Sequence, residues 1–150
     1  MRRTTRDLLD TNIALRLSNP LDPQHTLTVN AISNLALQGN QPVLTAQVLI
    51  EFWVVATRPV SVNGLGWSAD QTYSQIVQLL NGFTLLEDRP EIFPIWLQLI
   101  GDNKIQGKRA HDIRLIAVML AHSVDHLLTL NPREFAIVPH ITVIDPRTVV

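Results

Sequence analysis

Three acidic residues lie beside or within apolar runs, where a carboxylate needs a stabilising partner. Asp10 follows a short apolar run, Glu51 interrupts a longer one, and Asp112 precedes a third. Burying an unpaired carboxylate is costly, so such a group finds a cation, takes up a proton or lies on a narrow polar strip. Clustered carboxylates repel one another unless a hard cation neutralises them, and all-oxygen ligation suits Mg²⁺ or Mn²⁺. We therefore expect an acidic pocket that binds a divalent metal.

Each acid also has a purely structural interpretation. Asp10 could cap the N-terminus of a helix, where Asp is favoured. Glu51 could lie on an exposed strip of its helix, with Arg58 as a partner. Asp112 could interact with the dipole of the helix that follows it. For single residues, these alternatives stay open.

Positive charge gathers around Asp112, at Lys104, Lys108, Arg109, His111 and Arg114. A solvated loop is the simple explanation of this pattern. The functional one is phosphate positioning by basic side chains, for which we select Lys108, Arg109 and Arg114. An acidic centre with a basic rim suggests a phosphodiester substrate.

The composition narrows the class of protein. With 150 residues, of which 46% are hydrophobic, we expect one domain over residues 1–150. The absence of cysteine excludes disulfides, thiolate catalysis and zinc-thiolate sites, and favours a cytoplasmic location. The net charge of −1 gives no overall attraction to nucleic acid or membranes. The chain shows neither the apolar core of a signal peptide nor a membrane-spanning run, so we expect a soluble protein with no membrane partner.

Short apolar runs alternate with longer helical patterns, which is typical of βαβ units in a parallel sheet. The expected strands are Asp7–Asp10, Pro42–Thr45, Phe83–Leu86, His126–Leu130 and Ile141–Ile144. Asp10 then lies at the carboxyl edge of the sheet, where open α/β folds bind ligands. A helix that leads into a parallel strand begins at that same edge, so Asp112 can meet Asp10 there.

The helical patterns have recognisable ends. We expect helices over Thr26–Gln38, from Ser68 to about Leu80, from Pro90 to about Ile100, and over His111–His122, with a loop over Asp102–Gly107. Ser68 and Gln71 have the form of a capping box. Pro90 suits the first turn of a helix.

Several segments occur in an order that resembles PIN domains, especially the VapC-type toxins. They are Leu8-Leu9-Asp10-Thr11-Asn12, the isolated Glu51, Ala110-His111-Asp112, the run from Leu127 to Phe135, and Val143-Ile144-Asp145-Pro146. The resemblance covers almost the whole chain. It implies a three-layer α/β/α PIN-like fold with a central parallel sheet of about five strands. It also implies a Mg²⁺- or Mn²⁺-dependent endoribonuclease acting on RNA, a homodimer, and neutralisation by a cognate antitoxin.

The motif match assigns roles to individual residues. Asp10, Glu51 and Asp112 take the family's metal positions. Asn131 takes a catalytic position where many PIN domains have aspartate, a departure that weakens a second metal site. Asn12 and Thr129 are expected to orient Asp10 and nearby water by hydrogen bonds. The hypothetical mechanism is hydrolysis in which an ion held by Asp10 and Asp112 activates water and stabilises charge on the phosphate.

Other interpretations compete with a nuclease. A PIN-fold binding module without catalysis is one, with Asn131 marking the lost activity. A phosphatase of the haloacid dehalogenase type needs a second aspartate where this chain has Asn12. Metal-free acid–base catalysis by histidine is a third, yet His25, His122, His126 and His140 show no ligand spacing.

Two further sets of residues are interpreted as surface residues without a role in catalysis and as a partner-binding surface. Glu134 and Asp125 are interpreted as a loop acid and a solvent-facing turn residue. The apolar patterns of Thr26–Gln38 and Trp53 predict an exposed groove that binds a helix of a protein partner.

Overall fold

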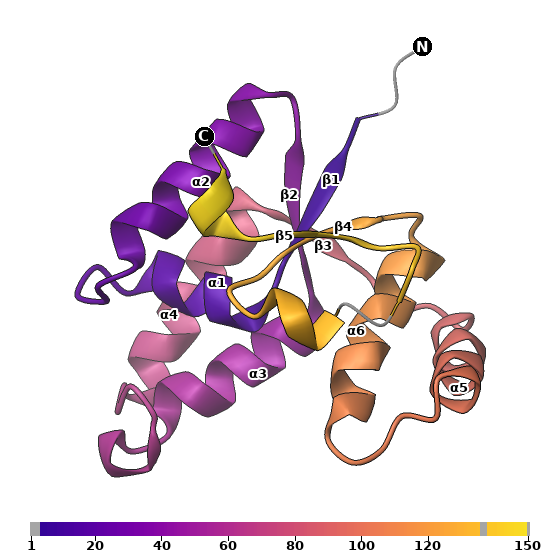
Figure 1. The fold of residues 1–150 in the computed structure, drawn as a ribbon. Helices are drawn as coiled ribbons and strands as arrows, with labels where there is room; N and C mark the ends of the chain where they lie inside the picture. The colour runs from indigo at the N-terminus through magenta and orange to yellow at the C-terminus, as the bar shows by residue number, and fades with distance from the viewer. Residues whose placement is uncertain (1–3, 136–137, 150) are drawn as a thin grey trace.

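The computed structural model describes residues 4–135 and 138–149, and these residues contain a five-stranded parallel sheet between helices (Figure 1). The strands are β1 (Arg6–Leu9), β2 (Gln41–Thr45), β3 (Thr84–Leu86), β4 (His126–Leu128) and β5 (Thr142–Ile144). Their order is β3-β2-β1-β4-β5, and every neighbouring pair is parallel. The predicted α/β fold with about five parallel strands is confirmed.

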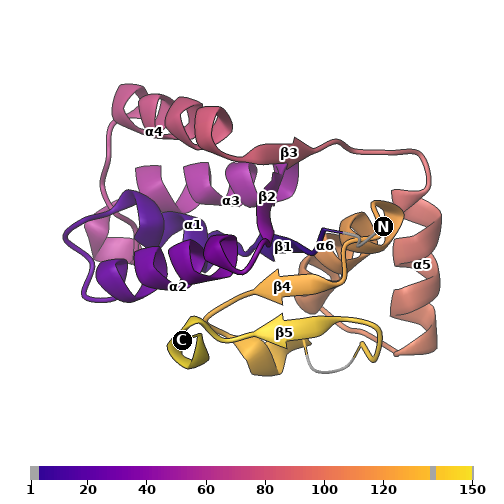
Figure 2. The ribbon, with the colours of Figure 1, turned by 90° about the horizontal axis from the view of Figure 1, so that it is seen from above.

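Helices cover both faces of the sheet. They are α1 (Thr11–Ser18), α2 (His25–Leu37), α3 (Ala46–Thr57), α4 (Ala69–Gly82), α5 (Ile92–Asp102) and α6 (Arg109–Ala121). Helices α1 to α4 lie on one side, and α5 and α6 pack together on the other (Figures 1 and 2). Short 3₁₀ turns occur at Val60–Val62, Pro132–Phe135 and Pro146–Thr148. The architecture is the expected three-layer α/β/α arrangement.

The central strands explain why this order forms. Strands β1, β2 and β4 carry consecutive apolar residues that are buried on both faces of the sheet, namely Leu8, Leu9, Val43, Leu44, Leu127 and Leu128. Such runs suit parallel strands that helices cover on both sides. Strand β1 therefore takes the middle of the sheet, with β2 on one side and β4 on the other. The chain order reverses between β1 and β4, and this reversal makes a switch point at their carboxyl ends.

The boundaries at this edge differ from those predicted. Strand β1 ends at Leu9, and Asp10 is the N-cap of α1, which confirms the structural interpretation of this residue, although the extent of the helix was not predicted. The Asp10 carboxylate accepts the backbone N–H of Thr11, which starts the helix immediately after the strand. Strand β4 ends at Leu128, two residues earlier than predicted, and the N–H of Leu130 donates to the Asn12 side chain instead.

The starts of α5 and α6 also differ from those predicted. Pro90 precedes α5, which begins at Ile92. Helix α6 begins at Arg109, two residues before the predicted start at His111, and Asp112 lies within its first turn. Ser68 caps α4 as predicted, with its hydroxyl accepting the N–H of Gln71 at 3.0 Å. Within residues 4–135 and 138–149, no helix combines the length and apolarity needed to cross a bilayer.

Candidate active site

Asp10 is the centre of a hydrogen-bond network at the switch point. The residue is only 8% exposed. Its Oδ1 accepts the N–H of Thr11 at 2.8 Å, and its Oδ2 accepts the hydroxyl of Thr129 at 2.7 Å. The Asn12 amide donates to the same Oδ2 at 3.3 Å. The carboxylate is therefore held by two residues of α1 and by Thr129, which directly follows β4.

Asn12 links the two central strands beside this carboxylate. Its Nδ2 also donates to the Thr129 hydroxyl oxygen at 3.3 Å, and its Oδ1 accepts the N–H of Leu130 at 3.1 Å. Asn12 and Thr129, selected from the sequence as orienting residues, thus both contact Asp10 and each other. The phosphatase alternative needs an aspartate at position 12, and an ionised aspartate could not make the donation to Asp10 that Asn12 makes. The structure therefore gives no support to that alternative.

Glu51 reaches the same edge from α3. Its Oε2 accepts the hydroxyl of Thr11 at 2.7 Å, and its Oε1 accepts the amide of Gln47 at 3.2 Å. Thr11 therefore bridges the two acids, since its backbone contacts Asp10 and its side chain contacts Glu51. Glu51 takes these polar partners in place of the Arg58 partner considered from the sequence.

Helix α3 has three chemically distinct faces. Val48 and Phe52 are fully buried in the core. Gln47 and Glu51, four residues apart, face the acidic site. Ile50 is exposed, with 64% of its surface accessible. The first two turns of α3 therefore present all three faces.

Asp112 and Glu134 complete the acidic group. Burial raises the pKa of Asp112, the negative charges of Glu134 and Glu51 raise it further, and Arg109 and His111 oppose this. Glu134 lies in the 3₁₀ turn after β4, and its charge has a larger effect on the pKa of Asp112 than any other charge does. From the sequence, Glu134 is interpreted as a loop acid. Its position soon after β4, at the carboxyl edge of the sheet, is the signal that could have identified it as part of the site.

The acids affect one another through their charges. The pKa of Asp10 is raised to about 6, mainly by burial, and the charges of Glu51 and Asp112 contribute to this rise. The hydrogen bonds from Thr129 and Thr11 stabilise the charged form and oppose it. A bound cation would relieve this repulsion, because an opposite charge nearby favours ionised carboxyl groups.

The fit to a divalent metal is one of donor chemistry. Carboxylate oxygens and a negative field suit Mg²⁺ or Mn²⁺. Among residues 4–135 and 138–149, however, no three acidic or histidine side chains lie close enough together to form a ready metal-binding group. Glu51 is turned toward Thr11 and Gln47. The residues therefore fit a hard cation in type and charge, and holding one requires their side chains to turn toward it.

Two of the three predicted phosphate-binding residues lie beside these acids. Arg114 donates to the side-chain oxygen of Gln47 at 3.1 Å and to Asp88 at 3.4 Å. Arg109 donates to the carbonyl of Glu134 at 3.4 Å. Lys108 is exposed at the start of α6. A cleft of about 420 Å³ opens here, lined by Ala46, Gln47, Ile50, Glu51, Asp88, His111 and Arg114.

The backbone of Asn131 is joined by one hydrogen bond to the network around Asp10. Its backbone N–H donates to the Thr129 hydroxyl oxygen at 3.1 Å. The residue is exposed and lines a different cleft, which it shares with Glu134, Asp145 and Arg147. The structure thus places the Asn131 backbone beside Thr129, whereas it gives its side chain no contact with Asp10. Its assigned catalytic role stays a prediction.

Three histidines contact groups other than the acidic cluster. His25 pairs with the carbonyl of Arg16, and His122 pairs with the carbonyl of Glu87. His126 pairs with Asp125, its neighbour in the chain. These contacts fit the ordinary structural roles expected from the sequence.

Comparison with known proteins identifies the fold. No family model and no curated protein matches the sequence. A chain in the structure of VapBC2 from Rickettsia felis bound to promoter DNA superposes with a TM-score of 0.71 and 18% identity, over 93% of this chain and 98% of that one. The chain has a PIN-like fold. A chain of VapBC-1 from nontypeable Haemophilus influenzae gives 0.70 and 19%, over 95% and 98%.

A further PIN-like match is VapC20 from Mycobacterium tuberculosis, described as a toxin that cleaves the sarcin-ricin loop. It aligns with a TM-score of 0.57 and 15% identity, over 80% of this chain and 85% of that one. In this PIN-like fold, the four acids lie near enough to the carboxyl edge of the sheet for their charges to act on Asp10 or Asp112.

Proposed function

We propose that this chain is a metal-dependent endoribonuclease that hydrolyses RNA phosphodiester bonds, and that it is the toxin of a VapBC-like toxin–antitoxin pair. The observation that carries the proposal is the arrangement of Asp10 and Asp112, on which the charges of Glu51 and Glu134 act, beside Arg109 and Arg114. The likeness of the fold to VapBC chains and to VapC20 supports it.

The chain's own residues would position substrate and ligands. Thr129, Thr11 and Asn12 orient the carboxylate of Asp10, and Gln47 orients Glu51. The side chains of Lys108, Arg109 and Arg114 supply positive charge for the RNA backbone. Mg²⁺ or Mn²⁺ held by Asp10, Glu51 and Asp112 would stabilise negative charge on the scissile phosphate and promote attack by water.

A protein partner would cover an apolar cleft of about 470 Å³ between α3, α4 and β3. Its lining is almost wholly apolar and consists of Ala46, Leu49, Ile50, Trp53, Val54, Ile76, Leu80 and Leu85. Exposed apolar surface of this kind marks protein interaction sites. We propose an apolar segment of the antitoxin as its occupant, in a cytoplasmic complex. The homodimer expected from the resemblance remains a proposal, to be checked by light scattering.

Two observations favour the binding-module alternative. The carboxylates are not collected into a ready metal group among the described residues, and Asn131 replaces an acid. A chain that binds Mn²⁺ without cleaving RNA is the expected behaviour of such a module.

The test is RNA cleavage by the purified chain at saturating Mn²⁺. Asp10→Asn and Asp112→Asn each remove ligand charge without changing side-chain size. Mutation of residues that only orient metal ligands lowers metal affinity or activity by roughly 10- to 100-fold. Loss of a ligand charge should therefore lower the cleavage rate of each variant by about 100-fold or more. Asp70→Asn is the matched control, because Asp70 is an exposed acid on α4. Cleavage by either site variant at the parental rate would show that the site is wrongly assigned.

A further inference from the structure

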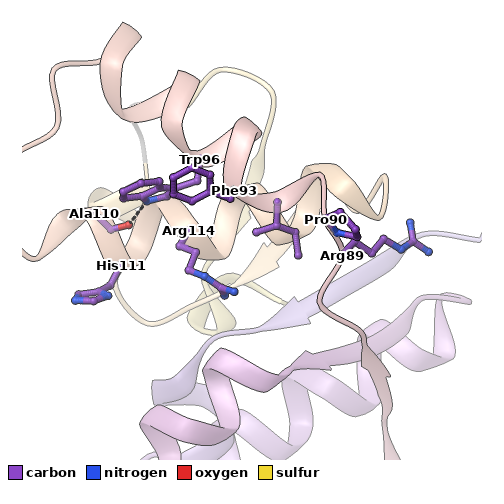
Figure 3. A pocket seen from close by; sticks show the side chains of 8 residues that line it. Arg89, Pro90, Phe93, Trp96, Ala110, His111 and Arg114 are labelled. Carbon is purple, nitrogen blue, oxygen red and sulfur yellow. Dashed lines mark hydrogen bonds between the residues drawn. The ribbon is translucent and has the colours of Figure 1, made fainter.

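A second cleft adjoins the acidic site on the other side of Arg114. It has a volume of about 450 Å³ and lies between the segment after β3, α5 and α6 (Figure 3). Its lining consists of Arg89, Pro90, Ile92, Phe93, Trp96, Ala110, His111 and Arg114. His111 and Arg114 also line the cleft that contains Glu51. The two clefts are therefore neighbours, and one ligand can occupy both.

The wall formed by α5 is aromatic and held in place. Phe93 and Trp96 lie one helical turn apart with ring centroids separated by 5.6 Å, and Phe93 is 63% exposed. The indole N–H of Trp96 donates to the carbonyl of Ala110 at 2.8 Å, which fixes the ring against α6 (Figure 3). A large exposed aromatic face beside a fixed ring is a preformed surface for stacking.

The opposite side of the cleft carries positive charge. Arg114 is held by Gln47 and Asp88, so that its guanidinium group lies between the two clefts. Arg89 is anchored on the carbonyl of Ala121 at 3.0 Å, at the far end of the cleft in Figure 3. These contacts hold both guanidinium groups before any ligand binds.

A nucleotide combines the two features that this cleft matches, a flat aromatic base and a charged phosphate. Bases of single-stranded RNA stack on aromatic side chains, whereas bases within a duplex are inaccessible to them. The cleft between α3 and α4 differs, since it offers an apolar lining without charge. We propose that the cleft of Phe93, Trp96 and Arg114 binds one unpaired base of single-stranded RNA next to the scissile phosphate. This inference rests on the proposed ribonuclease function.

The test measures binding separately from cleavage. An Asp10→Asn chain is titrated against a fluorescent single-stranded RNA, the same RNA annealed to its complement, and a set of RNAs that each lack one base. Phe93→Ala should weaken binding of the single strand by about tenfold, and Phe93→Tyr should restore it. One abasic position should weaken binding to the parent chain and change little in Phe93→Ala. Leu97→Ala is the control, because Leu97 is 52% exposed on the same helix and does not line the cleft.

The outcomes separate this inference from the proposed function. Phe93-dependent binding of single strands, together with no RNA cleavage by the chain that retains Asp10 at saturating Mn²⁺, would support the base site and overturn the nuclease. Cleavage of RNA with equal affinities for Phe93→Ala and its parent would overturn the base site alone. A change of oligomeric state in Phe93→Ala, seen by sedimentation, would also overturn it, because a second copy would then cover the cleft.

Discussion

Thr129 and Asp10 lie 119 positions apart in the chain, and the hydroxyl of Thr129 donates to Oδ2 of Asp10 at 2.7 Å. Both residues are buried. The contact joins the ends of the two central strands, and it stabilises the ionised form of a carboxyl group whose burial favours the neutral form. The hydroxyl of Thr129 thus opposes the effect of burial on the charge of Asp10.

Replacing Thr129 by valine should raise the pKa of Asp10 above its value of about 6. A hydrogen bond to a charged group is worth roughly 1.5–3 kcal/mol, which corresponds to about one pKa unit or more. Thr129→Ser keeps the hydroxyl and should keep the parental pKa. An NMR titration of the Asp10 carboxyl carbon in metal-free protein measures both. Equal pKa values in the valine and serine variants would mean that the hydroxyl does not act on Asp10.

The raised pKa of Asp10 also predicts how the stability of the metal-free protein depends on pH. The folded protein binds the Asp10 proton more tightly than the unfolded chain, so between about pH 6 and 4 acidification stabilises the fold. Asp10→Asn lacks this response. The free energy of unfolding of the variant, minus that of the parent, should therefore increase from pH 4 to pH 7.5 by up to about 3 kcal/mol. Urea unfolding in EDTA across this range measures the difference, and a constant difference would contradict the assignment.

Gln47 should act as a positioning residue for Glu51. Its amide donates to Glu51 and to the carbonyl of His111 at 2.7 Å, and its oxygen accepts from Arg114. Gln47→Leu removes all three contacts with little change in volume, so we expect RNA cleavage to fall by roughly 10-fold to 100-fold, as for partners that orient metal ligands.

The control for Gln47 is Gln78→Leu, at an exposed position of α4. Mn²⁺ binding followed by calorimetry gives a second readout, since a poorly oriented Glu51 weakens the metal even where folding is normal. Parental affinity and parental cleavage in Gln47→Leu would remove Gln47 from the site.

Asn131 offers a test of the position where many PIN domains carry aspartate. An amide brings no charge, so Asn131→Asp should lower the Mn²⁺ concentration needed for half-maximal cleavage, whereas Asn131→Ala should raise it or abolish activity. Both variants keep the backbone N–H that contacts Thr129. Metal titrations of RNA cleavage by the three proteins decide the matter. Superimposable curves would confine Asn131 to the neighbouring cleft and to the turn before Pro132.

The strands could be predicted because their signal is local. Runs such as Leu8-Leu9 and Leu127-Leu128 are buried on both faces of the sheet. Consecutive apolar residues are therefore enough to predict each of these strands. Helix α1 was missed because Asp10 ends the strand region and caps the helix within a single residue. The orienting roles of Asn12 and Thr129 came from the resemblance, whereas their hydrogen bonds depend on how β1 and β4 pair.

Glu134 and Gln47 show what the sequence patterns did not reveal. The influence of Glu134 on Asp112 depends on the 3₁₀ turn after β4 meeting the first turn of α6, which is a tertiary relationship. Gln47 had a visible signal, since it stands four residues before Glu51 and such pairs are neighbours on a helix. Its further contacts with His111 and Arg114 come from α6, on the other side of the sheet.

The three faces of α3 connect recognition with control of access. Ile50 and Glu51 are adjacent in the chain, and both line the cleft that Gln47, Asp88 and Arg114 also line. A protein that covers Ile50 and Val54 therefore stands at the entrance of that cleft without supplying any group to the carboxylates. Because RNA is a bulky polymer, such a cover would obstruct its approach while water and small ions still pass. Inhibition by occlusion would then leave the bond-breaking groups themselves unaltered.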